Sequence, residues 1–176
     1  MLGSEHEGDR TEAAEWLLHH RDESRPMLRA SAQRDKEPAR TASIRLLGKI
    51  GSQEDVDFLA RLLEEERGGV QWEAAQALRE HGSSLAVEAL VRAANSIDAQ
   101  TIEAAAVALG GVESARARAT LLQLLSHPAV DVRYRAVYAL GHQGIEGSRG
   151  ALNQHLSKEE DTEVRSLIKQ LLAGHA

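Results

Sequence analysis

A unit of about 31 residues recurs along most of this chain, and such a fixed period constrains the fold more than any other feature of the sequence. Beginning at Leu47, a leucine recurs every 31 residues three times in succession, and a further copy of the repeat follows near Leu171. The columns beside these leucines keep a small or apolar residue in each copy. The leucines are Leu47, Leu78, Leu109 and Leu140. Self-similarity at a fixed period predicts a repeat protein.

Each copy is predicted to form two helices joined by a short turn. Between Pro38 and Gly51 the small and apolar residues are spaced i, i+4, i+7, i+8 and i+11, which is one face of an α-helix. Gly48 and Gly51 are expected to end this helix, and Ser52 is expected to cap the next one. The same pattern predicts helix pairs at 37–66, 69–94, 98–126 and 129–156, and a last helix at 160–173.

The helix pairs predict an all-α fold, a right-handed α-solenoid of about five helix pairs. One pair cannot bury its own apolar face, so stacking of neighbouring pairs must supply a continuous core. We expect a flexible N-terminal tail at 1–10 and a single solenoid at 11–176. The solenoid divides into a degenerate first repeat at 11–36, repeats at 37–67, 68–98, 99–129 and 130–160, and a capping helix at 161–176.

Composition narrows the functional classes. The chain has no cysteine, which excludes disulfides and thiolate chemistry and suits the cytoplasm. Neither a signal peptide nor an apolar segment long enough to span a bilayer is visible, so we expect a soluble protein without a membrane partner. The net charge of -6 disfavours binding to nucleic acid, which depends on neutralising phosphates.

Two segments resemble the short HEAT repeat in its bilin-lyase-like form, whose pattern is Val-Arg-x-x-Ala-Ala-x-Ala-Leu-Gly. They are VRYRAVYALG, from Val132 to Gly141, and EAAQAL, from Glu73 to Leu78. The resemblance covers residues 37–172 and extends weakly over 11–36. It implies a solenoid scaffold but no single activity, because this repeat serves many unrelated roles.

The same resemblance implies a structural role for two arginines. Arg133 follows Asp131 and Val132, and Arg165 follows Glu163 and Val164. In HEAT arrays such acids and arginines commonly form ladders between repeats. We therefore expect these arginines to hold repeats together rather than to bind a partner.

Motifs for catalysis and metal binding are missing from the sequence. There is no Walker loop, no GxSxG and no HExxH, so we expect no catalytic residue and no cofactor. His19 and His20 are adjacent and would point about 100° apart on a helix. The other candidate ligands, His81, His142 and His155, fall near helix ends in different repeats. We expect no metal site.

The sequence therefore favours a non-catalytic scaffold or adaptor, a monomer in isolation, that binds a protein or peptide. Two alternatives stay open. The chain could be a bilin-lyase-like enzyme subunit that acts on phycobiliproteins, or an inhibitor or immunity partner of a toxin. Neither alternative has support in the sequence beyond the repeat type and the small acidic character of the chain.

Two surfaces are candidates for the partner. In HEAT solenoids the outer positions of the second helices line the concave side. Here those positions would form an apolar strip flanked by Arg and Gln, comprising Arg61, Val91, Arg92, Leu122 and Gln123. The other candidate is the outer side of the first helices, where Trp72 and Tyr134 share one column and Tyr138 lies one turn further on. Exposed aromatic residues are common binding hot spots, although all these apolar side chains could instead pack against neighbouring helices.

Charge is distributed unevenly. Residues 52–66 hold six acids and one base, whereas residues 111–150 hold five bases and three acids. This distribution has two interpretations. The charged segments could simply be two solvated faces, or they could form a polarised surface that orients a partner.

Overall fold

The structure is a computed structural model of the chain, and it describes residues 15–17 and 19–174. The tail predicted at residues 1–10 lies outside the described residues. Throughout the described part the regular structure is helical, so the predicted all-α class is confirmed. The chain divides into two compact units, unit 1 (Met1–Ala89) and unit 2 (Leu90–Ala176). We call the first helix of each repeat an A helix and the second a B helix.

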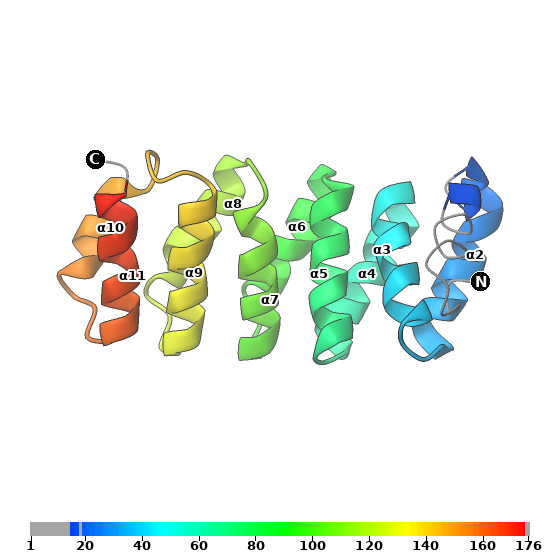
Figure 1. The fold of residues 1–176 in the computed structure, drawn as a ribbon, viewed down its shortest axis with the longest axis horizontal. Coiled ribbons are helices and arrows are strands. Elements are labelled where there is room, and N and C mark those ends of the chain that lie inside the picture. The colour runs from blue at the N-terminus through cyan, green and yellow to red at the C-terminus, as the bar shows by residue number, and fades with distance from the viewer. Residues whose placement is uncertain (1–14, 18, 175–176) are drawn as a thin grey trace. The chain divides into compact units, whose positions relative to one another are not determined.

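Unit 1 is built around α3, which packs against α2, α4 and α5 (Figure 1). The A helices of this unit are α3 and α5, and the B helices are α4 and the first part of α6. The helices are α2 (Arg21–Arg34), α3 (Ala39–Ile50), α4 (Gln53–Glu65), α5 (Gly69–His81) and α6 (Ser84–Ala93), and α6 continues into unit 2.

Unit 2 has the same two-helix organisation. Its A helices form one layer in which α9 packs against both α7 and α11, and Figure 1 shows the B helices α8 and α10 behind this layer. Helix α8 packs against α7 and α9, and α10 packs against α11. The helices are α7 (Ala99–Gly110), α8 (Ala115–Leu124), α9 (Val130–His142), α10 (Arg149–Leu156) and α11 (Thr162–Ala173).

The repeated columns form the core of each unit. All four repeat leucines have 0% exposure: Leu47 and Leu78 in unit 1, Leu109 and Leu140 in unit 2. The small column beside them, which contains Ser43, Ala74, Ala105 and Ala136, is equally buried. The period of the sequence therefore identified the face of each A helix that is removed from water, and that burial is the main stabilising contribution to the fold.

Gly48 has a different role from the helix end that the sequence suggested. Gly48 lies inside α3 rather than at its end. A Cβ atom at Gly48 would lie 2.6 Å from the carbonyl oxygen of Ala77, and one at Gly110 would lie 2.9 Å from Cα of Ala139. Glycine is thus required at these positions because neighbouring A helices pack closely there. The helix end itself falls at Gly51, where φ is 30°.

The predicted cap of α4 is confirmed. The Ser52 hydroxyl accepts a hydrogen bond from the backbone N–H of Asp55 at 3.3 Å, and the Asp55 carboxylate accepts one from the backbone N–H of Ser52 at 3.1 Å. This capping box satisfies donors that would otherwise be left unpaired at the start of the helix. Asp55 is fully buried and also accepts from Arg29 Nε at 2.6 Å, which ties α4 to α2.

Candidate functional site

The predicted partner-binding residues on the B helices are accessible. Arg61 of unit 1 is exposed on α4, and Arg92 and Gln123 of unit 2 are exposed at the equivalent positions of α6 and α8. In unit 2 the apolar neighbours Val91 and Leu122 are half-buried. On α6 and α8 the repeat thus places a polar side chain in solvent and keeps the preceding apolar side chain partly covered.

Helix α8 shows how the sequence produces this surface. Its exposed residues Arg116, Ala119 and Gln123 are spaced by three and four, so they lie on one face of the helix. The opposite face is buried against α7 and α9 and contains Ala117, Thr120, Leu121 and Leu124. Ser114 begins the helix, and its hydroxyl accepts from the backbone N–H of Arg116. The exposed face is therefore carried by a rigid, capped helix.

Two arginines on the A helices are each paired with an acid on a neighbouring A helix. In unit 1, Arg45 Nε lies 2.7 Å from Glu73 Oε1 and joins α3 to α5. In unit 2, Arg135 Nε lies 3.4 Å from Glu103 Oε2 and joins α9 to α7. Over residues 15–17 and 19–174, the side chains of Arg61 and Arg92 make no hydrogen bond or ion pair. These two guanidinium groups are available to an external carboxylate.

The aromatic residues on the A helices are less accessible than the B-helix arginines. Tyr138 on α9 is 42% exposed, but Tyr134 and Trp72 are half-buried. The Tyr138 ring meets His142 edge-on at 4.9 Å between centroids, and its hydroxyl lies 3.1 Å from His142 Nε2. The A-helix surface of unit 2 therefore presents one well-exposed aromatic side chain, which is held by a partner on the same helix.

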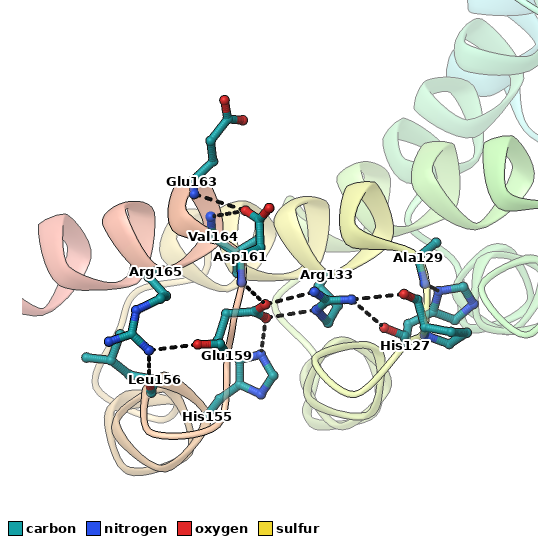
Figure 2. Close-up of polar contacts among 11 residues, drawn as sticks. His127, Ala129, Arg133, His155, Leu156, Glu159, Asp161, Glu163, Val164 and Arg165 are labelled. Atoms are coloured by element: carbon teal, nitrogen blue, oxygen red, sulfur yellow. Dashed lines mark hydrogen bonds and ion pairs between the residues drawn. The ribbon is translucent and has the colours of Figure 1, made fainter.

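A polar cluster in unit 2, which sequence reasoning did not identify, surrounds the buried carboxylate of Glu159 (Figure 2). Arg133 on α9 donates two hydrogen bonds to it, from Nη2 to Oε1 at 2.7 Å and from Nε to Oε2 at 2.8 Å. The backbone N–H of Asp161 donates to Oε1 at 2.9 Å, and His155 Nε2 lies 2.8 Å from Oε2. The hydrogen bonds from Arg133 are the main reason that the pKa of Glu159 falls from 4.5 to about 2.

The cluster is structural in its chemistry. Both oxygens of the Glu159 carboxylate accept two partners each, and its depressed pKa makes it a poor proton acceptor at neutral pH. Arg133 Nη1 also donates to the carbonyl oxygens of His127 and Pro128, both at 3.0 Å. The cluster therefore fastens α9 to the loops on either side of it and has no free group for a reaction.

The ion-pair ladder between repeats that was expected at Arg133 and Arg165 does not form, and both arginines make other contacts. Arg133 pairs with Glu159, in the loop after α10, which belongs to its own repeat and not to a neighbouring one as expected. In unit 1, Arg40 pairs with Glu66 of its own repeat over the same separation in sequence, at 2.5 Å. The two pairs lie three repeats apart in the sequence. This recurrence of an arginine and a glutamate at the same spacing is the sequence signal from which the pairs could have been predicted. Arg165 donates instead to the carbonyl oxygens of Leu156 and Glu159, at 2.9 and 2.7 Å. All three arginines thus serve the fold.

Within the described residues, no three His, Cys, Asp or Glu side chains lie together in a way that could hold a metal ion. His81 and His142 end α5 and α9, and His155 lies in the last turn of α10. No helix of the described part is both long and apolar enough to cross a membrane.

With this geometry in place, comparison with known proteins identifies the family. The sequence matches the family described as HEAT repeats over residues 1–79, 39–109 and 87–173. These overlapping matches cover most of the chain, which therefore belongs to the HEAT-repeat family and has the predicted α-solenoid class of fold. A search of curated proteins finds no sequence that matches this chain.

Solved structures agree with this fold. The complex of CpcE and CpcF of phycocyanin lyase from Nostoc sp. PCC7120 matches with a TM-score of 0.53 and 24% identity, over 95% of this chain and 71% of that chain. A designed armadillo repeat protein in complex with the peptide (KR)4 matches with a TM-score of 0.53 and 17% identity, over 99% and 96% of the two chains. Human deoxyhypusine hydroxylase in complex with glycerol also has a TM-score of 0.53, at 18% identity over 99% and 82%.

Proposed function

We propose that this protein is a non-catalytic scaffold that binds a protein or peptide partner through its B helices. The observation that carries the proposal is the pair of exposed arginines whose side chains make no hydrogen bond or ion pair within the described residues, Arg61 in unit 1 and Arg92 in unit 2. We call Val91, Arg92, Leu122 and Gln123 the unit 2 B-helix surface. This surface combines a free guanidinium with partly exposed apolar side chains.

Two physical arguments support this surface. Arginine is enriched at binding hot spots, and adjacent apolar area gives a partner something to desolvate. The helices that carry these residues are fixed by a buried core, so little ordering cost is added when a partner binds. The designed armadillo repeat protein mentioned above was solved with the peptide (KR)4, and this supports peptide binding by a similar stack of helices.

We also propose that the protein is cytoplasmic and monomeric, and that it binds neither nucleic acid nor a membrane. The absence of cysteine from the whole sequence supports the first part. The net charge of -6 supports the exclusion of nucleic acid.

A second candidate is a subunit of a bilin lyase, which the similarity to the CpcE and CpcF complex favours. The presence or absence of bound pigment distinguishes the two proposals. Co-expression with a bilin source and a phycobiliprotein should leave the purified chain colourless and the pigment content of the phycobiliprotein unchanged if the scaffold proposal holds. Pigment bound to the chain, or chromophore attachment that depends on it, would support the lyase.

The binding surface is tested by charge reversal. Arg92→Glu should weaken capture of the native partner by at least about tenfold, or about 1.4 kcal/mol, while circular dichroism and melting stay unchanged. Lys49→Glu is the matched control, because it makes the same change of charge on an exposed position of the A helix α3. If Trp72→Ala or Tyr134→Ala abolishes capture while Arg92→Glu has no effect, the partner binds the A helices and the proposed surface is wrong.

A further inference from the structure

Arg118 on α8 carries a half-buried positive charge that has no partner. Its Nε atom is buried, and over the described residues its guanidinium makes no hydrogen bond or ion pair. The neighbouring arginines Arg116 and Arg149 differ, because both have partners, and Arg149 donates to the carbonyl oxygen of Leu172 at 3.3 Å. A partly buried charge that nothing compensates is costly, so the Arg118 guanidinium favours an anion from outside the chain.

The loop before α10 accommodates this guanidinium at a glycine. A Cβ atom at Gly147 would lie 2.3 Å from Nη1 and 2.9 Å from Cζ of Arg118, so the guanidinium occupies the space that a side chain at position 147 would fill. Gly147 does not have a positive φ, so the approach of Arg118 explains the glycine and the backbone conformation does not. Arg118 of α8 is therefore held beside the N-terminal end of α10, the next B helix.

The start of α10 holds further donors that lack an acceptor. Ser148 is the N-cap residue and is 1% exposed, but its hydroxyl does not cap the helix and has no hydrogen-bond partner within the described residues. In the first turn, the backbone N–H groups of Gly150 and Ala151 donate to no carbonyl oxygen of residues 19–174. The helix dipole adds a partial positive charge at this end. All these groups are satisfied by the same ligand atom, a negatively charged oxygen.

The acids of the flanking loops limit the charge that this site accepts. Glu146 directly precedes Gly147, and Glu113 lies in the loop before α8. Both are exposed, and in the described part of the chain neither makes an ion pair. One guanidinium and one helix end beside these acids match a single negative charge better than the double charge of a phosphate. The charge balance therefore favours a carboxylate.

We propose that Arg118 and the N-terminal end of α10 form a carboxylate site that binds one Asp or Glu side chain of the partner protein. The carboxylate would accept from the planar guanidinium of Arg118 and from the N–H groups of Gly150 and Ala151. A carboxylate on a methylene stem is narrow enough to approach the buried hydroxyl of Ser148. Leu122, which lies one turn after Arg118, belongs to the unit 2 B-helix surface. The inference therefore rests on the proposed function and specifies one anchor of its partner.

The test is an NMR titration of the full chain at constant ionic strength with four small probes. N-acetylglutamate α-amide carries a carboxylate on its side chain, and its isomer N-acetylglutamine carries one on its main chain. N-acetylglutamine amide carries no charge, and N-acetylphosphoserine amide carries a phosphate. The first probe should shift the amide signals of Gly150 and Ala151 and the Nε–H signal of Arg118 until they saturate. It should bind at least about threefold more tightly than its isomer or the phosphate probe, and the uncharged probe should shift none of these signals.

Four variants locate the site. Arg118→Gln removes the guanidinium and should weaken binding of the side-chain carboxylate by about tenfold or more. Gly147→Ala displaces the guanidinium without a change of charge and should also weaken binding, so it decides the matter if Arg118→Gln folds poorly. Lys169→Gln, at an exposed position of the A helix α11, removes the same charge from unit 2 and should leave binding within about twofold. Glu146→Gln removes a competing charge and should strengthen binding by about twofold.

Each alternative result has a defined meaning. No shift from N-acetylglutamate α-amide, or binding that both Arg118→Gln and Gly147→Ala leave unchanged, overturns the carboxylate site. Equal or tighter binding of N-acetylglutamine overturns the side-chain assignment in favour of a C-terminal carboxylate, and tighter binding of the phosphate probe overturns it in favour of a phosphorylated partner. If Arg92→Glu weakens capture of the native partner but Arg118→Gln does not, the proposed function stands without this anchor. If neither variant weakens capture, both proposals fail.

Discussion

Replacing Glu159 with glutamine removes the buried charge that joins α9 to the loop before α11 in unit 2. The substitution keeps the shape of the side chain but takes away the carboxylate to which Arg133 donates two hydrogen bonds. Arg133 is only 15% exposed, so its guanidinium would be left partly buried without the carboxylate that it pairs with. Such an uncompensated charge is costly, and we expect Glu159→Gln to be among the most destabilising polar substitutions in the chain.

The expected loss can be worked out in two ways. The pKa of Glu159 is about 2 in the folded protein against an ordinary value of 4.5. At about 1.4 kcal/mol for each tenfold change in proton affinity, this depression corresponds to about 3 kcal/mol of stabilisation. Removing one member of a buried ion pair costs about 3–5 kcal/mol in general. Both routes predict that Glu159→Gln lowers the free energy of unfolding by about 3–4 kcal/mol at neutral pH.

The sign of the pH dependence follows from the depressed pKa. The stabilisation is fully present above the unfolded-state pKa near 4.5 and is lost as pH falls toward about 2. In urea melts, the difference between wild type and Glu159→Gln should therefore shrink by roughly 2 kcal/mol between neutral pH and pH 3. Glu160→Gln, at the adjacent exposed position, is the control and should change stability by less than about 0.5 kcal/mol. A loss below about 1 kcal/mol for Glu159→Gln, or no dependence on pH, would refute the reasoning.

Four further predictions concern the repeat core, two glycines and the choice of ligand. Leu109→Ala should lower the free energy of unfolding by about 2–5 kcal/mol in denaturant melts, because the side chain is fully buried, and a loss under about 1 kcal/mol would show that it is not interior. Gly48→Ala should destabilise by about 1–3 kcal/mol through the clash with Ala77. By contrast, Gly150→Ala should stabilise α10 by about 0.5–1 kcal/mol because the site is open, and equal effects of the two glycine substitutions would contradict the close-packing argument. Labelled duplex DNA at low salt should show no binding tighter than the non-specific range of about 10⁻⁴–10⁻⁶ M, so nanomolar affinity would contradict the scaffold proposal.

The sequence was sufficient to predict the fold because the repeat controls it. A residue that recurs once in every repeat on one helical face is buried in every copy, as the four leucines are. The capping box at Ser52 was also readable, since its two members are close together on one chain segment. Local patterns of this kind depend on spacing along the chain and not on which helices become neighbours.

Features that depend on neighbouring helices were harder to predict. The spacing predicts a helix end at Gly48, but glycine is required there because α3 approaches Ala77 on another helix. The partner of Arg133 was not identified because Glu159 is distant in sequence and lies in a loop. Repeat position predicts the candidate binding residues, and the structure exposes Arg92 among them.

The central claim, that a partner binds through the B helices, is tested most directly by photo-crosslinking in the native cell. A benzophenone side chain would replace Gln123 on the B helix α8 or, as the matched control, Tyr138 on the A helix α9, since both positions are exposed. We predict a single discrete adduct from position 123 and none from position 138, with the adduct lost when Arg92→Glu is added. A discrete adduct from position 138 and none from position 123 would contradict it.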